Sequence, residues 1–226
     1  MFRNTALTLN DAALFASGLG MTLLVFTASF ALGSLGGLGL ALLRERRVPV
    51  LAQIAFVYVE LFRNSPLLVQ LFLIFFGLPS IFGISLTPLA AGLFALGINT
   101  AAFMAVIIQS AIEEVPRGQW EAARSSGLNY GRIMIYIVAP QAVRAMIPPT
   151  IGLAVGQLQV SSLVSIIGVI DLTKVGGILN LRTQAPYLVW SLVGAGYFVV
   201  SKPLSLLADW AEARLAVPGT STRAAK

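Results

Sequence analysis

Five long apolar runs dominate the chain and are separated by shorter polar segments. They fall at roughly 12–43, 48–78, 88–112, 145–170 and 186–208. Each run is long enough for the roughly 20 residues that a helix needs to cross the hydrocarbon core of a bilayer. The runs show no alternating period of two, and backbone amides in lipid need partners within the segment, so helices are expected in place of a barrel. The pattern predicts five transmembrane helices.

The composition places the whole chain in a membrane. Of its 226 residues, 57% are hydrophobic and 11% are charged, and the mean hydropathy is +0.86. A soluble domain of this length needs far fewer apolar residues for its core. We therefore expect an all-α integral membrane protein with one domain over 1–226, a core at about 12–210 and a flexible tail at 211–226. The chain has no cysteine or histidine, which excludes disulfides, thiolate or imidazole metal ligands and histidine acid–base chemistry.

The cations predict the orientation of the chain, because positive residues gather on the cytoplasmic side of a membrane. They follow the first, third and fifth runs, as Arg44, Arg46 and Arg47, then Arg117, Arg124 and Arg132, then Arg214, Arg223 and Lys226. The opposite side keeps Arg3, Lys174 and Arg182. The N-terminus is thus expected outside and the C-terminus in the cytoplasm. The first run precedes its arginines, unlike a secretory signal, and is interpreted as a retained, tilted helix. The net charge of +6 is scattered over separate loops, so no nucleic-acid partner is expected.

The loop at about 113–132 is the longest polar stretch between two runs. Pro116 and Gly118 can open a short helix, Gln119 to Ser126 are compatible with one, and Gly127 can adopt the left-handed conformation that closes it. The loop is therefore predicted to hold a helix of two to three turns. On spacing alone, an ordinary amphipathic surface loop is the alternative.

Three ordered blocks carry a resemblance to a known family. Glu121-Ala122-Ala123 is followed by Gly127 and then by Ala139-Pro140-Gln141-Ala142, a register that resembles the EAA loop of ABC importer permeases. The family has a leucine at the position of Ala139. The second block, 58–70, resembles the second-helix signature of the polar amino acid branch, with Asn64-Ser65 where Gly-Thr is usual. The third block, 161–169, is similar to the latter part of the fourth helix of that branch.

The resemblance, which covers roughly 15–210, implies a function and a set of partners. It implies the permease subunit of an ATP-driven importer of polar amino acids or derivatives such as opines, with the type I fold, in the bacterial inner membrane. It also implies a homodimer or heterodimer with a similar permease, two nucleotide-binding subunits that hold ATP and Mg²⁺, and an external binding protein docked near 79–88 and 171–185. No glycine precedes a lysine in this chain, so a phosphate-cradling P-loop cannot form, and we expect neither a bound cofactor nor enzymatic activity.

The resemblance implies that the loop helix couples this chain to the ATPase subunit. The residues expected to do so are Gln119, Glu121, Ala122, Ala123, Arg124 and Gly127. Small Ala122 and Ala123 on one side suit a helix that sinks into a groove on a partner, and Glu121 offers a charge to a partner arginine. Gly127 would turn the chain sharply back toward the membrane.

Polar residues inside the apolar runs are the candidates for a substrate pathway. Those selected are Glu60, Arg63, Asn64, Asn99, Gln159, Ser161 and Ser162. A charge at mid-membrane costs about 2.5–3.5 kcal/mol, so Glu60 and Arg63 are expected to face the interior and to pair, either for packing or for transport. Pro66 is expected to kink the second helix nearby. Asn99 is expected to lie in one cluster with Gln159, Ser161 and Ser162 that lines the pathway, although such residues taken singly more commonly join two helices.

Two departures from the family leave the substrate open. A Lys-Asp pair is frequent where Gln159-Val160 stand, and Asn-Glu or Asn-Gln is frequent where Leu153-Ala154 stand. Either the substrate is not a cationic amino acid, or this chain is the non-binding member of a heterodimer.

Further expectations concern packing and the rival classes of protein. Gly33 and Gly37 suit close packing of the first helix, and Pro148-Pro149 is expected to break the fourth segment, leaving Arg132 to Ile147 as an interfacial helix. The rivals are an ion-coupled secondary transporter of a small polar solute and a non-transporting scaffold. A secondary transporter would need an ionisable relay and an internal repeat, and Glu60 alone is a strong candidate for such a relay.

Overall fold

A computed structural model describes residues 7–45 and 49–215 of the chain. All regular structure within these ranges is helical, which confirms the predicted fold class. The helices are α1 (Leu9–Glu45), α2 (Pro49–Arg63), α3 (Leu67–Phe72), α4 (Leu78–Phe82), α5 (Pro88–Glu113), α6 (Arg117–Ser125), α7 (Tyr130–Ile133), α8 (Ala139–Val160), α9 (Leu172–Thr183) and α10 (Pro186–Leu215). The cations at 3, 46, 47, 223 and 226 lie outside the described residues, as does the part of the expected tail beyond 215. Residues 211–215, also expected in the flexible tail, belong to α10, where Ala211 is buried.

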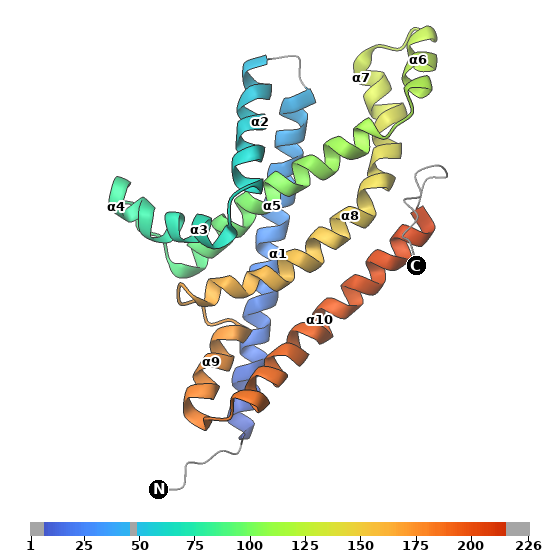
Figure 1. Ribbon diagram of the computed structural model, residues 1–226. Helices are drawn as coiled ribbons and strands as arrows, with labels where there is room; N and C mark the ends of the chain where they lie inside the picture. The colour runs from blue at the N-terminus through green and yellow to red at the C-terminus, as the bar shows by residue number, and fades with distance from the viewer. Residues whose placement is uncertain (1–6, 46–48, 216–226) are drawn as a thin grey trace, which may run out of the picture.

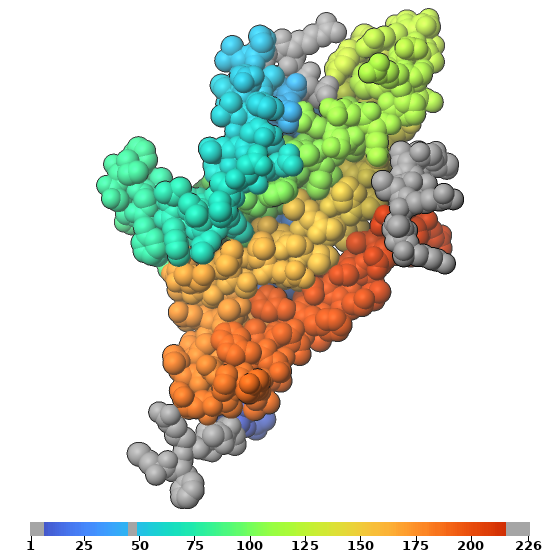
Figure 2. All heavy atoms as spheres, in the orientation of Figure 1, coloured from blue at the N-terminus to red at the C-terminus, as the bar shows by residue number. Residues whose placement is uncertain are grey.

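The helices form one elongated body around α5. Figure 1 shows α9 and the start of α1 at one end, and α6 and α7 at the other, with α8 and α10 running between. The segment α3–α4 projects to one side, as Figure 2 shows in cyan and green. Helix α5 is the most enclosed of the long helices, and its small buried residues, such as Ala91, Ala95 and Ala102, let its neighbours approach closely.

Three of the described helices are long and apolar enough to cross a membrane by themselves, namely α1, α5 and α10. A fourth crossing results if α2 and the segment Leu67–Phe82 count as one span, although they are bent by 106° relative to each other. Helix α8, within which the fourth apolar run begins, has 22 residues but is less apolar. The architecture is consistent with five crossings, and the count of five stays a prediction.

The first helix, α1, packs closely against α5 at the two glycines expected to allow this. A Cβ atom added to Gly33 would collide with Thr100 and lie 2.7 Å from the carbonyl oxygen of Gly97. A Cβ atom added to Gly37 would lie 2.6 Å from the Cβ of Met104. Neither position has room for a side chain, so the two glycines set the distance between the backbones of α1 and α5.

Proline determines the shape of two helical segments. The predicted kink at Pro66 is confirmed, because α2 ends at Arg63 and α3 begins at Leu67 after the 106° bend. Two π-helical turns, Leu73–Gly77 and Met134–Val138, each end two residues before a proline, Pro79 and Pro140. A proline ring in an α-helix collides with the carbonyl four residues earlier. The wider π turn moves that carbonyl away, so the helix continues through the proline.

The prediction that Pro148-Pro149 breaks the fourth segment is wrong. Helix α8 runs from Ala139 to Val160 with both prolines inside it, so no separate interfacial helix ends at Ile147. The φ angle of proline is compatible with an α-helix, and the costs are a missing hydrogen bond and a ring contact. Met146 before the prolines and Leu153 after them pack against one buried cluster, which includes Met104 of α5. This tertiary packing on both sides of the prolines keeps the helix continuous.

The segment 171–185, expected as an outward loop, is mostly helix α9. Asp171 caps its first turn, because its carboxylate accepts a 2.8 Å hydrogen bond from the amide of Lys174. Gln184 ends the helix in the left-handed conformation, with φ 56°. Helix α8 ends at Val160, inside the fourth apolar run, and is followed by a short 3-10 turn, Ser161–Ser165. The sequence pattern missed α9 because its polar caps are typical of loops as well.

Candidate functional site

The loop at 113–132 folds into two short helices, α6 and α7, at one end of the molecule (Figure 1). The predicted helix is confirmed as α6. Five of the six residues expected to couple this chain to a partner are exposed, namely Gln119, Glu121, Ala122, Arg124 and Gly127. They are close enough in sequence to form one surface on this end of the chain.

The sixth residue, Ala123, faces the opposite way. It is buried in a cluster of this chain's own residues, together with Val115 and Ile133. The prediction that Ala122 and Ala123 form one partner-facing side is therefore wrong for Ala123. An amphipathic helix on a surface must bury one stripe against its own protein, and Ala123 and the half-buried Trp120 lie three residues apart on that stripe.

The end of α6 is fixed by hydrogen bonds of its own backbone. Gly127 has the predicted left-handed conformation, with φ 76°. Its amide donates to the carbonyl oxygen of Arg124 at 2.9 Å, and the amide of Leu128 donates to that of Ala123 at 3.2 Å. This pair of bonds is the Schellman motif, and the contact of Leu128 with the buried cluster accompanies it.

The start of α7, which follows the turn, is also held in place by defined contacts. The side chain of Asn129 accepts a 3.0 Å hydrogen bond from the amide of Arg132 and so caps α7. The ring of Trp120 stacks on that of Tyr130, with centroids 6.0 Å apart and planes inclined by 29°. Contacts on both sides of the turn thus hold α6 against α7.

A second group of candidate residues lies at the bend between α2 and α3. Pro66 has no amide hydrogen, so the carbonyl oxygen of Phe62 lacks the donor that a continuous helix would supply. The side-chain amides of Gln70 and Asn99 donate to that oxygen at 2.9 and 3.2 Å. Asn99 also donates to Gln70 Oε1 at 3.2 Å. Gln70 further donates to the carbonyl oxygen and the hydroxyl of Ser65, at 3.1 and 2.9 Å. A buried pair of amides thus joins the bend to α5.

The charged residues before the bend do not form the expected pair. No ion pair joins Glu60 and Arg63, and both side chains are exposed in the isolated chain. Glu60 instead accepts a 3.0 Å hydrogen bond from the Asn64 amide, and the guanidinium of Arg63 lies 5.9 Å from the centre of the Phe103 ring. The three-residue spacing brings two side chains to one face of a helix, but here Glu60 bonds to nearby Asn64 and Arg63 lies against Phe103 of α5.

The expected cluster of Asn99 with Gln159, Ser161 and Ser162 does not form through hydrogen bonds. Asn99 bonds to the α2–α3 bend, whereas the Ser161 hydroxyl donates to the carbonyl oxygen of Leu158 and that of Ser162 to Gln159, at 2.7 and 2.8 Å. Gln159 is exposed and Ser161 is buried. Exposed Gln159 stays available to a ligand or partner, and the hydroxyls are satisfied within their own helical turn.

Three polar contacts that the structure shows were not predicted from the sequence. Gln70 was noted only as the end of a motif, although a buried amide one turn after a proline is a signal that it serves the freed carbonyl. Gln157 is buried and donates to the Leu96 carbonyl oxygen at 3.3 Å, which ties α8 to α5. Asp11 and Arg182 form a salt bridge of 2.6 Å between α1 and α9. Their separation of 171 residues leaves no local pattern to detect.

The described residues hold no group of three or more Cys, His, Asp or Glu side chains placed to bind a metal ion.

Comparison with known proteins assigns the class of this architecture. Residues 33–217 match the family described as the inner membrane component of binding-protein-dependent transport systems. Because the match covers most of the chain, the protein belongs to this family. It is a membrane subunit of a transport system and not an enzyme, as the sequence indicated. An ion-coupled secondary transporter or a scaffold does not fit this membership.

Individual members of the family that resemble this chain are named as permease proteins of amino-acid or octopine transport systems. The chain is 40% identical over 200 residues to a probable glutamine ABC transporter permease protein, GlnP, of Bacillus subtilis, covering 87% of this chain and 91% of the relative. It is 33% identical over 212 residues to GlnM of the same organism, described in the same words, covering 94% and 98%. An octopine transport system permease protein, OccM, of Rhizobium radiobacter is 34% identical over 207 residues, covering 86% and 84%.

A solved structure agrees with these relatives. The structure, an amino acid ABC transporter with histidines, has 37% sequence identity to this chain and a TM-score of 0.86, covering 90% of this chain and 94% of the other. The methionine ABC transporter MetNI, in an inward-facing conformation, has a TM-score of 0.75 at 19% identity and shows the shared fold alone. The resemblance read from the three sequence blocks is therefore confirmed.

Proposed function

We propose that this chain is the permease subunit of an ABC importer that moves polar amino acids, or close derivatives, into the cytoplasm. The observation that carries the proposal is the exposed helix α6, held rigidly on a chain whose relatives are named as amino-acid or glutamine permeases. In this proposal, ATP and Mg²⁺ bind to two separate nucleotide-binding subunits. An external binding protein delivers the substrate to the opposite side.

The coupling surface consists of Gln119, Glu121, Ala122, Arg124 and Gly127 in this proposal, with Ala123 as an anchor. Glu121 and Arg124 are exposed charges of opposite sign on a helix that protrudes from the end of the body (Figure 1). A partner groove with a cation opposite Glu121 would complement them. The Schellman turn and the Trp120–Tyr130 stack would transmit movement of that groove into α8 with little loss.

This surface defines the cytoplasmic side. The ends of α1 and α10 that carry Arg44 and Arg214 belong to it by the positive-inside rule, as does Arg117 at the start of α6, just after α5. The N-terminus then lies outside and the C-terminus inside, in the bacterial inner membrane.

The pathway for substrate runs along the face that carries Glu60, Arg63, Asn64 and Gln159. All four side chains are exposed in the isolated chain, although they belong to apolar runs, and lipid is a poor environment for them. A second permease, identical or similar, covers this face and encloses a polar channel. Asn99 does not line the pathway itself but holds the α2–α3 bend next to Asn64 through its hydrogen bonds to Phe62 and Gln70. Ser161 and Ser162 belong to the 3-10 turn that follows α8.

The substrate class follows from what this face offers. Glu60 and Arg63 present one charge of each sign, and Asn64 and Gln159 present amides. An amino acid has an ammonium and a carboxylate, which these two charges complement, and an amide side chain would find matching donors and acceptors. Relatives named for glutamine, L-cystine and octopine agree with a polar amino acid or derivative.

Co-purification tests the proposal. The tagged full chain is co-expressed with its ATPase subunit and extracted in mild detergent, and the stoichiometry of the complex is measured. We expect a complex with two permease and two ATPase chains. Glu121→Lys should release the ATPase, whereas Glu114→Lys, at an exposed acid outside α6, should retain it. A chain that purifies alone, or retention by Glu121→Lys, contradicts the coupling surface.

A further inference from the structure

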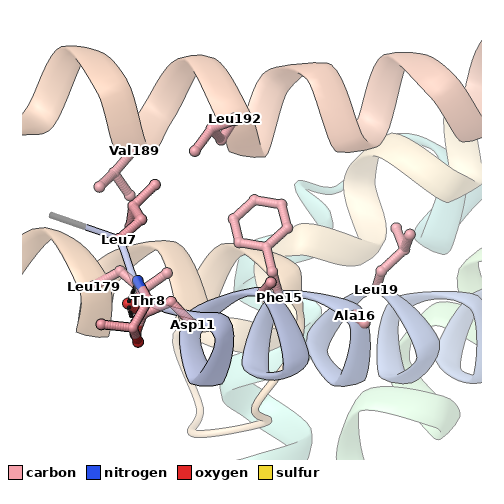
Figure 3. A pocket seen from close by; sticks show the side chains of 10 residues that line it. Leu7, Thr8, Asp11, Phe15, Ala16, Leu19, Leu179, Val189 and Leu192 are labelled. Carbon is pink, nitrogen blue, oxygen red and sulfur yellow. Dashed lines mark hydrogen bonds between the residues drawn. The ribbon is translucent and has the colours of Figure 1, made fainter.

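A groove lies between α1 and α10 at the end of the molecule opposite α6. It encloses about 370 Å³, and Figure 3 shows Phe15 of α1 standing between the two helices, with Val189 and Leu192 of α10 facing it. Leu179 of α9 also lines it. The transport function proposed above uses none of these residues.

The lining is suited to a hydrocarbon chain. Apart from Thr8 and Asp11, the residues that line the groove are apolar. An apolar cavity of about 150 Å³ holds a benzene molecule, so 370 Å³ has room for a chain of roughly a dozen carbon atoms or more. On α1 the lining extends from Asp11 to Leu19, about 12 Å at 1.5 Å per residue, and Leu7 and Thr8 add to it just before the helix begins. One leaflet of the hydrocarbon core is about 15 Å thick, so the lining on α1 covers most of one leaflet.

The groove faces the side of the molecule that meets lipid. It is bounded by α1 and α10, two of the three described helices that are long and apolar enough to cross a membrane. Helix α10 is exposed along most of its length, including Leu188, Trp190 and Leu192. In Figure 1 the two helices lie close together near α9 and diverge toward the other end.

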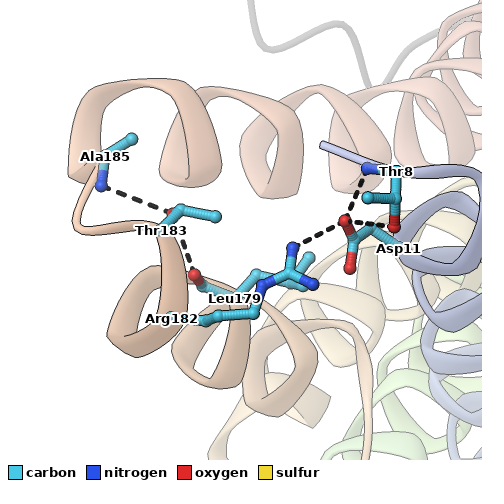
Figure 4. Close-up of polar contacts among 6 residues, drawn as sticks. All are labelled: Thr8, Asp11, Leu179, Arg182, Thr183 and Ala185. Atoms are coloured by element: carbon cyan, nitrogen blue, oxygen red, sulfur yellow. Dashed lines mark hydrogen bonds and ion pairs between the residues drawn. The ribbon is translucent and has the colours of Figure 1, made fainter. Parts of the chain in front are cut away.

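A cation lies beside the outer end of this groove. Asp11, which lines it, accepts hydrogen bonds from the amide and the hydroxyl of Thr8 at 2.6 and 2.8 Å, and from Arg182 Nη2 at 2.6 Å (Figure 4). The side chain of Asp11 is 6% exposed, whereas that of Arg182 is 47% exposed. Among the described residues, Asp11 is the one side chain that accepts from the guanidinium. The other N–H donors of Arg182 remain accessible, and Lys174 is a second exposed cation on the same helix.

We propose that this groove binds one phospholipid, with an acyl chain between α1 and α10 and the phosphate on the accessible N–H donors of Arg182. Charge complementarity favours a phosphate there, because Arg182 is exposed while its acidic partner Asp11 is buried. A guanidinium binds phosphate oxygens through two parallel hydrogen bonds, which a neutral headgroup cannot reproduce. The bound lipid fills the groove and thereby connects the start of α1 to α9 and α10.

Native mass spectrometry of the full chain in detergent tests this site with matched variants. Ala16 lines the groove, and Ala13 is exposed on the same helix but does not line it. We expect the wild type to retain one phospholipid, Ala16→Phe to lose it, and Ala13→Phe to keep it. A wild type without lipid, or equal retention by both variants, overturns the proposal. Loss in both variants, or closure of the groove by a second copy of the chain, overturns it as well.

The headgroup is tested with added phosphatidylglycerol and with diacylglycerol of the same acyl chains. The wild type should prefer phosphatidylglycerol by roughly tenfold or more, the factor expected for a charge-assisted hydrogen bond. Arg182→Gln should abolish the preference, and Asp11→Asn/Arg182→Gln should do the same without leaving a buried carboxylate unpaired. A preference that survives in the double variant shows that Arg182 does not hold the phosphate, and the site as proposed is then wrong.

Discussion

Gln70 should be the most sensitive polar residue of the α2–α3 bend. The change Gln70→Met keeps the volume and flexibility of the side chain but removes three donated hydrogen bonds, to the Phe62 carbonyl and to the carbonyl and hydroxyl of Ser65. Asn99 still donates to Phe62, so the Ser65 carbonyl is the group that loses its donor. A polar group left without its donor costs about 1–3 kcal/mol when buried, and the half-buried Ser65 carbonyl belongs at the lower end of this range; with the other lost bonds, the total is about 2–4 kcal/mol.

Thermal unfolding in detergent, followed by tryptophan fluorescence, measures this loss. In a chain of this length, 1 kcal/mol corresponds to about 2–4 °C, so Gln70→Met should lower the Tm by roughly 4–16 °C. Gln53→Met is the matched control, because Gln53 is an exposed glutamine of α2. Asn99→Leu combined with Gln70→Met should destabilise less than the sum of the two changes, since they share one network. A Tm unchanged by Gln70→Met, or equally lowered by Gln53→Met, refutes the account of the bend.

Two further changes test positions at which the backbone requires glycine. Gly33→Val should prevent folding or strongly lower the Tm, because the valine side chain would collide with Thr100. Gly39→Val is the control and should be tolerated, since a Cβ atom added there has no neighbour within 4 Å. Similar yields of folded protein for the two variants would contradict the α1–α5 packing. Gly127→Asp should leave the chain folded in the membrane but reduce uptake, since left-handed backbone costs other residues about 1–2 kcal/mol, while Gly118→Asp should transport normally. Equal uptake by these two aspartate variants would show that the Gly127 turn does not matter for coupling.

The sequence was most informative where one residue type has few structural options. A left-handed glycine closing a polar helix at Gly127, a kink at Pro66 and close helix packing at Gly33 were all predicted, and all are present. In each case the backbone chemistry of glycine or proline decides the local structure before tertiary contacts act.

Predictions failed where distant packing decides the outcome. Pro148 was expected to end a helix, but contacts on both sides of it keep α8 continuous. Ala123 was assigned to a partner, but in a short amphipathic helix the sequence alone does not say which stripe faces the chain's own core. Glu60 and Arg63 have the spacing of an ion pair, yet Asn64 and Phe103 are their partners, and Phe103 comes from another helix.

The central claim is that α6 couples an ATPase to transport through this chain, and one measurement tests it most directly. The complex of this chain with its ATPase subunit is reconstituted in liposomes, and ATP hydrolysis is measured with and without the binding protein loaded with a polar amino acid. We predict that the loaded binding protein stimulates hydrolysis and uptake together. Glu121→Lys should abolish both effects, while Glu114→Lys keeps them. Stimulation and uptake that are unchanged in Glu121→Lys would contradict the claim.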